Sequence, residues 1–364
     1  MKQLKYLLTG IALLLLSITA NAQLAGKNVL LIHGFQAQHL LLHPADDGLA
    51  DSLVYWQDFE PTLMDPASSR ILYWPSQERI SGPDGSAAVI ASQLKPILES
   101  GFCDDQCVLL THSTGDLVAR YVLANKLSLL GSTLANRFKV AAVIDMAGAG
   151  GGTELASLAV DMAYGAMIGL LGLEALEDVI GIELDPGTYL GVINDLQPSV
   201  ARNTAVNSIP AIPRLRIAAT GDEIYGPVAH LFIKGGDDSQ VPLHSACGAA
   251  DSVAYDSCVQ DLQMDGRITR VWNAPSQSQL YDYHYPIILS ATTPHDSMRG
   301  NMTGHDMTFA LSGADNYSSG DAKTIDVAVE YETSNGWWDW FHEYRFITGA
   351  KEKTMGRVIV DSFE

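Results

Sequence analysis

Apolar and polar positions along the chain form two patterns that follow one another. Short continuous apolar runs bounded by turn residues are typical of strands buried in a parallel sheet. Such runs occur within residues 29–32, 70–74, 108–110 and 139–145, and we expect a further strand at 214–220. Between them, apolar residues recur at the spacing of a helix, as at 86–99 and from 115 to about 130. This alternation predicts an α/β fold in which a mostly parallel sheet has helices on both faces.

Three further stretches depart from this alternation. Residues 155–184 are unusually rich in leucine and methionine, which predicts one or two apolar helices inserted after a sheet strand. These helices could cover a binding site, or they could be a pair that is buried in the core or at a dimer interface. In the tail, 324–331 alternates apolar and polar residues, and 357–363 is a second apolar run, so we expect a strand at each.

The N-terminus has the pattern of a secretory signal peptide. Lys2 and Lys5 precede an apolar run at 6–18, and Ala20-Asn21-Ala22 fits the small-x-small pattern of a cleavage site. This predicts removal of 1–22 and export of the mature chain to the periplasm or the outside. An uncleaved anchor is the alternative, although the apolar run is short for a membrane span.

These patterns divide the chain into three parts. Residues 1–22 form the signal peptide, and 23–312 form one main α/β domain with a helical insertion at about 151–185. Residues 313–364 are expected to form a small β-rich extension packed on that domain.

Charge and cysteine content narrow the class of protein. The chain has 42 acidic and 22 basic side chains, and this acidic balance argues against nucleic acid as a partner. The four cysteines form two close pairs, Cys103 with Cys107 and Cys247 with Cys258. In an exported protein this predicts two local disulfides. Zinc binding through the first pair is the alternative, but no neighbouring pair of histidines completes a zinc site.

The main candidate for chemistry is Thr111-His112-Ser113-Thr114-Gly115, which joins a predicted strand to a predicted helix. A serine on such a tight turn is held with its hydroxyl exposed above the sheet, an arrangement called a nucleophile elbow. Gly115 would let the turn pack closely, and the Thr114 amide could donate to a developing oxyanion. An ordinary N-cap serine is the alternative interpretation.

The pentapeptide resembles the G-x-S-x-G motif of the α/β-hydrolase family, and its extension to Tyr121 is similar to bacterial lipases and esterases. Thr111 departs from the motif at the first glycine. Asp116 stands where a second glycine often follows Gly115. The resemblance implies an α/β-hydrolase fold, and it implies that the apolar insertion at about 151–185 is a lid.

The same resemblance assigns a role to His33-Gly34-Phe35, which ends an early strand. In α/β hydrolases such a His-Gly pair opens the oxyanion loop, so the Phe35 amide would be one oxyanion donor and the Thr114 amide the other. Two amides directed at one point stabilise the charge that develops when an ester carbonyl is attacked.

The loop at 234–245 resembles the Asn-Asp-Gly-x-Val-Pro loop that contains the acid in bacterial lipases. Residue-by-residue matching places Asp238 at the acid, with Ser239 where glycine is usual. A carboxylate there would hold the catalytic imidazole in the right tautomer and stabilise its charged form. Asp237 and Asp222 remain alternatives.

The base should follow the acid, because the family order is serine, acid, histidine. The candidates are His284, His295, His305 and His342. We favour His305, because it follows a loop of small residues and precedes a predicted helix, and the base in this family usually lies on such a loop. His295 is the second choice.

These residues predict an exported lipase or esterase that cleaves small-molecule or lipid esters through an acyl-enzyme on Ser113. The aromatic cluster at 337–341 could contact a lipid surface or a sugar, with a buried anchor as the alternative, and no cofactor is required. By resemblance, Asp222 and Asp306 could hold a structural calcium ion. A thioesterase, a polyester depolymerase or an acyltransferase would use the same site, and a non-catalytic binding protein with this fold is the remaining alternative. The sequence does not indicate the oligomeric state.

Overall fold

The computed structural model describes residues 24, 26–43, 48–165, 176–177, 180–181, 183–204, 212–221, 229–253, 267–268, 281, 284, 287–290, 293–304, 307–310, 329–333 and 343–362. The predicted signal peptide lies outside these residues, and so does most of the apolar stretch after residue 165. No helix in the described part of the chain is long and apolar enough to cross a membrane.

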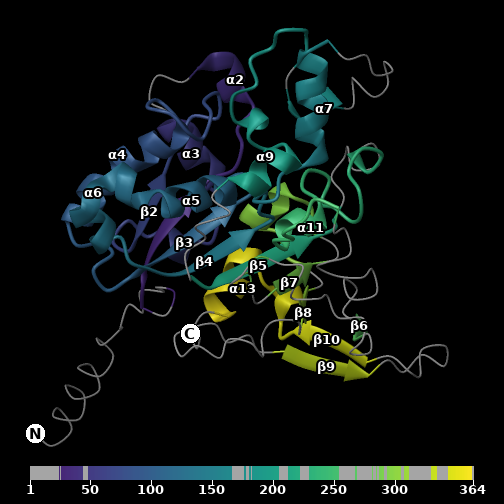
Figure 1. The fold of residues 1–364 in the computed structure, drawn as a ribbon. Coiled ribbons are helices and arrows are strands. Elements are labelled where there is room, and N and C mark those ends of the chain that lie inside the picture. Colours follow the sequence, from purple (N-terminus) through teal and green to yellow (C-terminus); the bar gives the residue numbers. More distant parts are fainter. Residues whose placement is uncertain are drawn as a thin grey trace, which may run out of the picture.

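A seven-stranded sheet forms the centre of the described structure (Figure 1). Its strands lie in the order β2-β1-β3-β4-β5-β7-β8, and every neighbouring pair is parallel except β7 with β8. The strands are β1 (Asn28–Ile32), β2 (Ser69–Leu72), β3 (Cys107–His112), β4 (Val140–Met146), β5 (Arg214–Ala219), β7 (Ile287–Ser290) and β8 (Met307–Ala310). The predicted mostly parallel sheet is therefore confirmed.

Strand register determines where the candidate residues meet. Ile32 of β1 pairs with Thr111 of β3, and Thr111 pairs with Asp145 of β4. Because parallel strands end at a common edge, the loops after β1, β3 and β4 come together at the carboxyl edge of the sheet. This edge is where ligands bind in open α/β sheets.

Helices cover both faces of the sheet, as alternation along the strands requires. Leu30 of β1 belongs to one hydrophobic cluster and Leu31 to the other. The first cluster includes residues of α4 (Ser86–Glu99), α5 (Gly115–Ala124), α6 (Lys126–Arg137), α7 (Glu154–Ala163), α9 (Pro198–Asn203) and α11 (Leu243–Ala246). The second includes residues of α13 (Met355–Ser362), η1 (Pro61–Met64) and η6 (Asp296–Arg299). In Figure 1, α4, α5 and α6 lie on one side of the sheet and α13 on the other.

The remaining described elements are short. The helices α2 (Gln38–Leu42) and α3 (Leu49–Tyr55) follow β1, in a segment with no clear helical period in the sequence. The single turns η2 (Gly191–Asn194) and η8 (Ala350–Glu352) belong to connecting segments.

The C-terminal part differs from its predicted form. The strands β6 (Arg267–Ile268), β10 (Glu343–Ile347) and β9 (Val329–Thr333) form a separate antiparallel sheet. The prediction of a strand at 357–363 was wrong, because this segment belongs to helix α13. Met355, Val358 and Ile359 have the spacing of one helical face, and all three are buried against the central sheet. A short apolar run does not distinguish a strand from one turn of a buried helix.

The first predicted disulfide is confirmed. Cys103 and Cys107 are disulfide-bonded, with their Cα atoms 4.9 Å apart, and the bond closes the turn that leads into β3. Cys258, the predicted partner of Cys247, lies outside the described residues.

We expect substitution of Ile359 by alanine to lower the free energy of unfolding by about 2–5 kcal/mol, the usual cost of truncating a buried isoleucine. Ile359 is fully buried in the cluster on the second face of the sheet. Arg357→Ala is the matched control in the same helix, because the side chain of Arg357 is 47% exposed. Urea titration would give both values, and equal effects of the two substitutions would contradict the packing of α13 on the sheet.

Candidate active site

Ser113 lies on a tight turn between β3, which ends at His112, and α5, which begins at Gly115. Its φ angle is 55°, in the left-handed region that L-residues rarely adopt. Three backbone bonds hold this conformation. The Ser113 amide donates to the Met146 carbonyl at 3.0 Å, and the Ser113 carbonyl accepts from Ala149 at 2.9 Å and from Asp116 at 3.1 Å. A strained residue fixed from several sides is typical of a functional turn.

Two glycines allow the turn and the loop after β1 to approach each other. A Cβ on Gly115 would lie 2.5 Å from the Ile32 carbonyl oxygen, and a Cβ on Gly34 would lie 2.7 Å from the Ser113 Cβ. Neither distance is tolerated by real side chains, so both positions require glycine. Thr111, where the motif has glycine, is still part of β3, and its hydroxyl donates to Asp145 Oδ1 at 2.6 Å.

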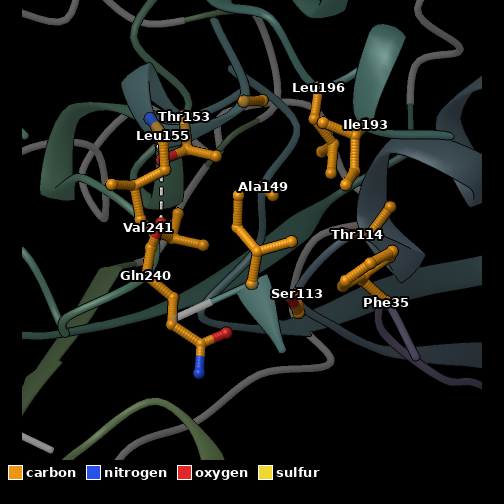
Figure 2. Close-up of a pocket in the computed structure, with 12 residues that line it drawn as sticks. Phe35, Ser113, Thr114, Ala149, Thr153, Leu155, Ile193, Leu196, Gln240 and Val241 are labelled. Atoms are coloured by element: carbon orange, nitrogen blue, oxygen red, sulfur yellow. Dashed lines mark hydrogen bonds between the residues drawn. The ribbon is translucent and has the colours of Figure 1, made fainter. Parts of the chain in front are cut away.

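Ser113, Phe35 and Thr114 line one pocket of about 470 Å³, a volume that includes its opening to solvent (Figure 2). Among the described residues, neither the Phe35 nor the Thr114 amide donates a hydrogen bond to another part of the chain. The rest of the wall is mainly apolar. It includes Ala149, Leu155, Ala156, Ile180, Ile193, Leu196 and Val241. Figure 2 shows Phe35, Thr114 and Ser113 together on one side, with Val241 and Gln240 opposite.

A second, more polar cleft of about 1000 Å³ adjoins this pocket, and the two share Phe35, Ile180 and Gln240. Its other lining residues include Gln36, Asp51, Tyr55, Asp296 and Arg299. Ile180 belongs to the segment that the sequence predicts to be a lid, and it is one of the residues of that segment that the structure describes. A Cβ added to the adjacent Gly181 would touch Ala37, so this segment lies against the start of α2. Whether the insertion is a lid stays a prediction.

Asp238 is buried and bonds to one histidine. Its Oδ1 accepts from the amides of Gln240 at 3.1 Å and Val241 at 2.7 Å, while its Oδ2 lies 2.7 Å from Nδ1 of His295. His295 is 1% exposed. Ser239 has a φ of 79°, which explains why glycine is usual at this position of the loop.

The other acid candidates are placed differently or lie outside the described residues. Asp237 pairs with Nδ1 of His230 at 2.7 Å. Asp222 and Asp306, the residues suggested for calcium, lie outside the described part of the chain. Among the residues that are described, no group of three or more histidine, cysteine, aspartate or glutamate side chains could hold a metal ion.

The structure also distinguishes between the histidine candidates. His305 and His342 lie outside the described residues, and the helix predicted after His305 is instead the strand β8. His284 is buried beside Arg120, whose Nη2 lies 3.1 Å from its Nε2. Burial and the neighbouring guanidinium groups lower the pKa of His284 well below its usual value. The described partner of Asp238 is therefore His295, the second choice from the sequence. In the sequence it stands in Thr293-Pro294-His295-Asp296, and in the structure it is the N-cap residue of the single turn η6.

A buried ionic cluster lies below the serine turn. It consists of Asp116, Asp145, Arg120, Arg214 and Arg216, whose side chains are fully buried. Asp116 contacts Arg214 at 3.1 Å, Arg216 at 2.9 Å and Arg120 at 3.3 Å, and Asp145 contacts Arg216 at 2.9 Å. This contact set accounts for Asp116 where related motifs have glycine.

The pKa values of the two carboxyl groups of the cluster shift in opposite directions. Burial alone would raise the pKa of Asp116, but the three guanidinium groups hold that pKa well below its usual range. For Asp145, burial has the larger effect and raises the pKa to about 7. The glycine-rich loop at 148–152 packs on these carboxylates, because a Cβ on Gly148 or Gly150 would collide with Asp145 or Asp116.

We expect Asp116→Asn to lower the free energy of unfolding at pH 7 by about 3–5 kcal/mol, because it leaves buried guanidinium groups without their anion. Since the folded pKa of Asp116 is depressed, its stabilising effect is complete above the unfolded pKa of roughly 4 and is lost as the pH falls further. The difference between wild type and variant should therefore shrink below about pH 4. Urea titrations from pH 7 to pH 3 measure this.

Asp104→Asn is the control for this prediction, because it breaks an ion pair with Arg137 on the surface. It should change stability little at any of these pH values. An equally small effect of Asp116→Asn would show that the cluster does not need its central anion.

Comparisons with known proteins find distant likenesses among solved structures. No protein-family model matches the chain. No curated protein matches it either. Among solved structures, lipase 1 of Pelosinus fermentans is 14% identical with a TM-score of 0.40, over 75% of this chain and 93% of that one. The mature lipase BlEst2 of Bacillus licheniformis is 15% identical with a TM-score of 0.39, over 61% and 79%. The putative non-heme bromoperoxidase BpoC of Mycobacterium tuberculosis is 17% identical with a TM-score of 0.30, over 55% and 76%.

Proposed function

We propose that this protein is an exported serine hydrolase of the α/β-hydrolase type that cleaves carboxylic esters. The observation that supports this most directly is the setting of Ser113. It occupies a strained turn in an apolar pocket, beside two amides without partners in the described structure. The buried pair of His295 and Asp238 is linked to the residue before Ser113, since the His295 carbonyl is 3.0 Å from Nε2 of His112.

In the proposed reaction, the Ser113 hydroxyl attacks the ester carbonyl and His295 takes its proton. Asp238 orients the imidazole through Nδ1 and stabilises its charged form. The amides of Phe35 and Thr114 donate to the oxyanion. The tetrahedral intermediate collapses, the alcohol leaves with the proton from His295, and an acyl-enzyme remains. Water, deprotonated by His295, then releases the acid and restores the serine.

The two cavities suggest how an ester would be oriented. The apolar pocket next to Ser113 suits the acyl chain, and the polar cleft that adjoins it suits the alcohol. Burial of each methylene contributes about 0.8 kcal/mol, so kcat/KM should rise roughly fourfold per methylene until the pocket is full.

We expect Ser113→Ala and His295→Ala each to lower kcat/KM for p-nitrophenyl esters by about a thousandfold or more, as for the loss of a nucleophile or its base. His305→Ala is the matched control and should keep most of the activity. Both histidine variants should unfold at the wild-type urea concentration for the comparison to be valid. Loss of activity in His305→Ala with activity retained in His295→Ala would reverse the assignment of the base.

We expect Ala156→Phe to shorten the preferred acyl chain. Ala156 lies on α7 and lines the pocket, so a phenyl ring there would occupy the space of several methylenes. Activity on acetyl esters should change within about threefold, while activity on octanoyl esters should fall more than tenfold. Ala163→Phe, on the same helix but not lining the pocket, is the control. An unchanged chain-length profile in Ala156→Phe would place the acyl chain elsewhere.

A further inference from the structure

His112 is a buried histidine that the proposed mechanism does not use, although it precedes the nucleophile. It is fully buried, and its ring centroid lies 4.7 Å from that of His295. Its Nε2 is 3.0 Å from the His295 carbonyl oxygen, and its Nδ1 is 2.5 Å from the hydroxyl of Tyr55. The side chain of His112 therefore joins the end of β3 to the loop that contains the base and to helix α3.

The partners of His112 fix its tautomer. A carbonyl oxygen only accepts hydrogen bonds, so Nε2 must be the protonated nitrogen. Nδ1 then accepts from the Tyr55 hydroxyl. Burial and the nearby His295 and Arg299 lower the pKa of His112 well below its usual value, and burial raises the pKa of Tyr55 above its usual value. Both side chains are therefore neutral at ordinary pH, and only one hydrogen-bonding pattern is available to them.

The base loop is also held from its far end. Nη1 of Arg299 donates to the Tyr55 carbonyl at 2.8 Å, and the Arg299 guanidinium lies 4.0 Å from the centre of the Tyr55 ring. His295 and Arg299 are at the two ends of η6, so Tyr55 and His112 together fix both ends of this turn. The bond from His112 Nε2 to the His295 carbonyl links this turn to the last residue of β3, directly before the nucleophile.

We propose that His112 is a positioning residue, which sets the distance between His295 and Ser113 by bonding the His295 carbonyl to the end of β3. This inference rests on the proposed function of Ser113 and His295. A misplacement of about 1 Å can lower a rate about a hundredfold, so one lost hydrogen bond at this point has a large effect. A histidine that only fills the core would affect stability and leave the catalytic geometry unchanged.

The test compares His112→Leu, which removes both bonds, with His112→Gln, whose amide N–H can replace the donor at Nε2. We expect His112→Leu to lower kcat about 10–100-fold with KM changed less than about threefold, and His112→Gln to recover most of kcat. His39→Leu is the matched control. It removes another fully buried imidazole, which accepts from the Ser76 amide and pairs with Asp51. It should lower stability without a comparable loss of kcat.

A second readout does not depend on turnover. The loop at 293–300 is bonded to the end of β3 through the His295 carbonyl, so its backbone amides should exchange with solvent faster once that bond is lost. Hydrogen exchange in this loop should be faster in His112→Leu than in the wild type, in His112→Gln or in His39→Leu.

The outcomes separate the two proposals. Wild-type hydrogen exchange of the 293–300 loop in His112→Leu, or equal losses of kcat in the leucine and glutamine variants, would overturn the positioning role. If this loop exchanges faster as expected but the wild type cleaves no ester, the positioning role stands and the proposed function fails.

Discussion

The close approach of two loops at the carboxyl edge of the sheet is the constraint on which the rest of the site depends. The loop after β1 and the turn after β3 approach so closely that both Gly34 and Gly115 lack room for a methyl group. This contact brings Phe35 to the pocket that Ser113 and Thr114 also line. A parallel pairing of β1 with β3 is what brings the two segments to the same edge. The geometry proposed to bind an oxyanion thus depends on the register of the sheet and on two glycines, Gly34 and Gly115.

The layer below that contact is unusual because it is ionic. Three arginines and two aspartates are fully buried between the sheet and the helices of its first face. Removing such charges from water costs several kcal/mol for each ion, and their mutual attraction offsets that cost only in good geometry. We interpret the cluster as a device that specifies one arrangement of α5, β5 and the glycine-rich loop. An apolar layer could be equally stable, but it would tolerate small shifts that the serine turn above it cannot.

The sequence was most informative where function depends on neighbours in the chain. Phe35, Ser113 and Thr114 lie in local patterns of strand, turn and glycine, and the structure brings all three to one pocket. The base was harder to assign, because the sequence predicts a loop at both His295 and His305, and only tertiary structure shows that His295 reaches Asp238. The segment of helix α13 was predicted to be a strand for a related reason. An apolar run of about one helical turn is too short to show a helical period in the sequence. Nothing in one sequence marks Arg214 and Arg216, inside a strand, as buried.

The position of α13 has a consequence for how the chain reaches its native state. This helix covers the second face of the central sheet, yet it follows every strand of that sheet in the sequence. During folding, strands β1 to β5 can pair while the part of their second face that α13 covers is still open to water. Contacts between segments so distant in sequence form late, because the entropy of closing a long loop opposes them. That apolar surface would be exposed to chaperones, or to other unfolded chains, until the segment at 355–362 packs on it.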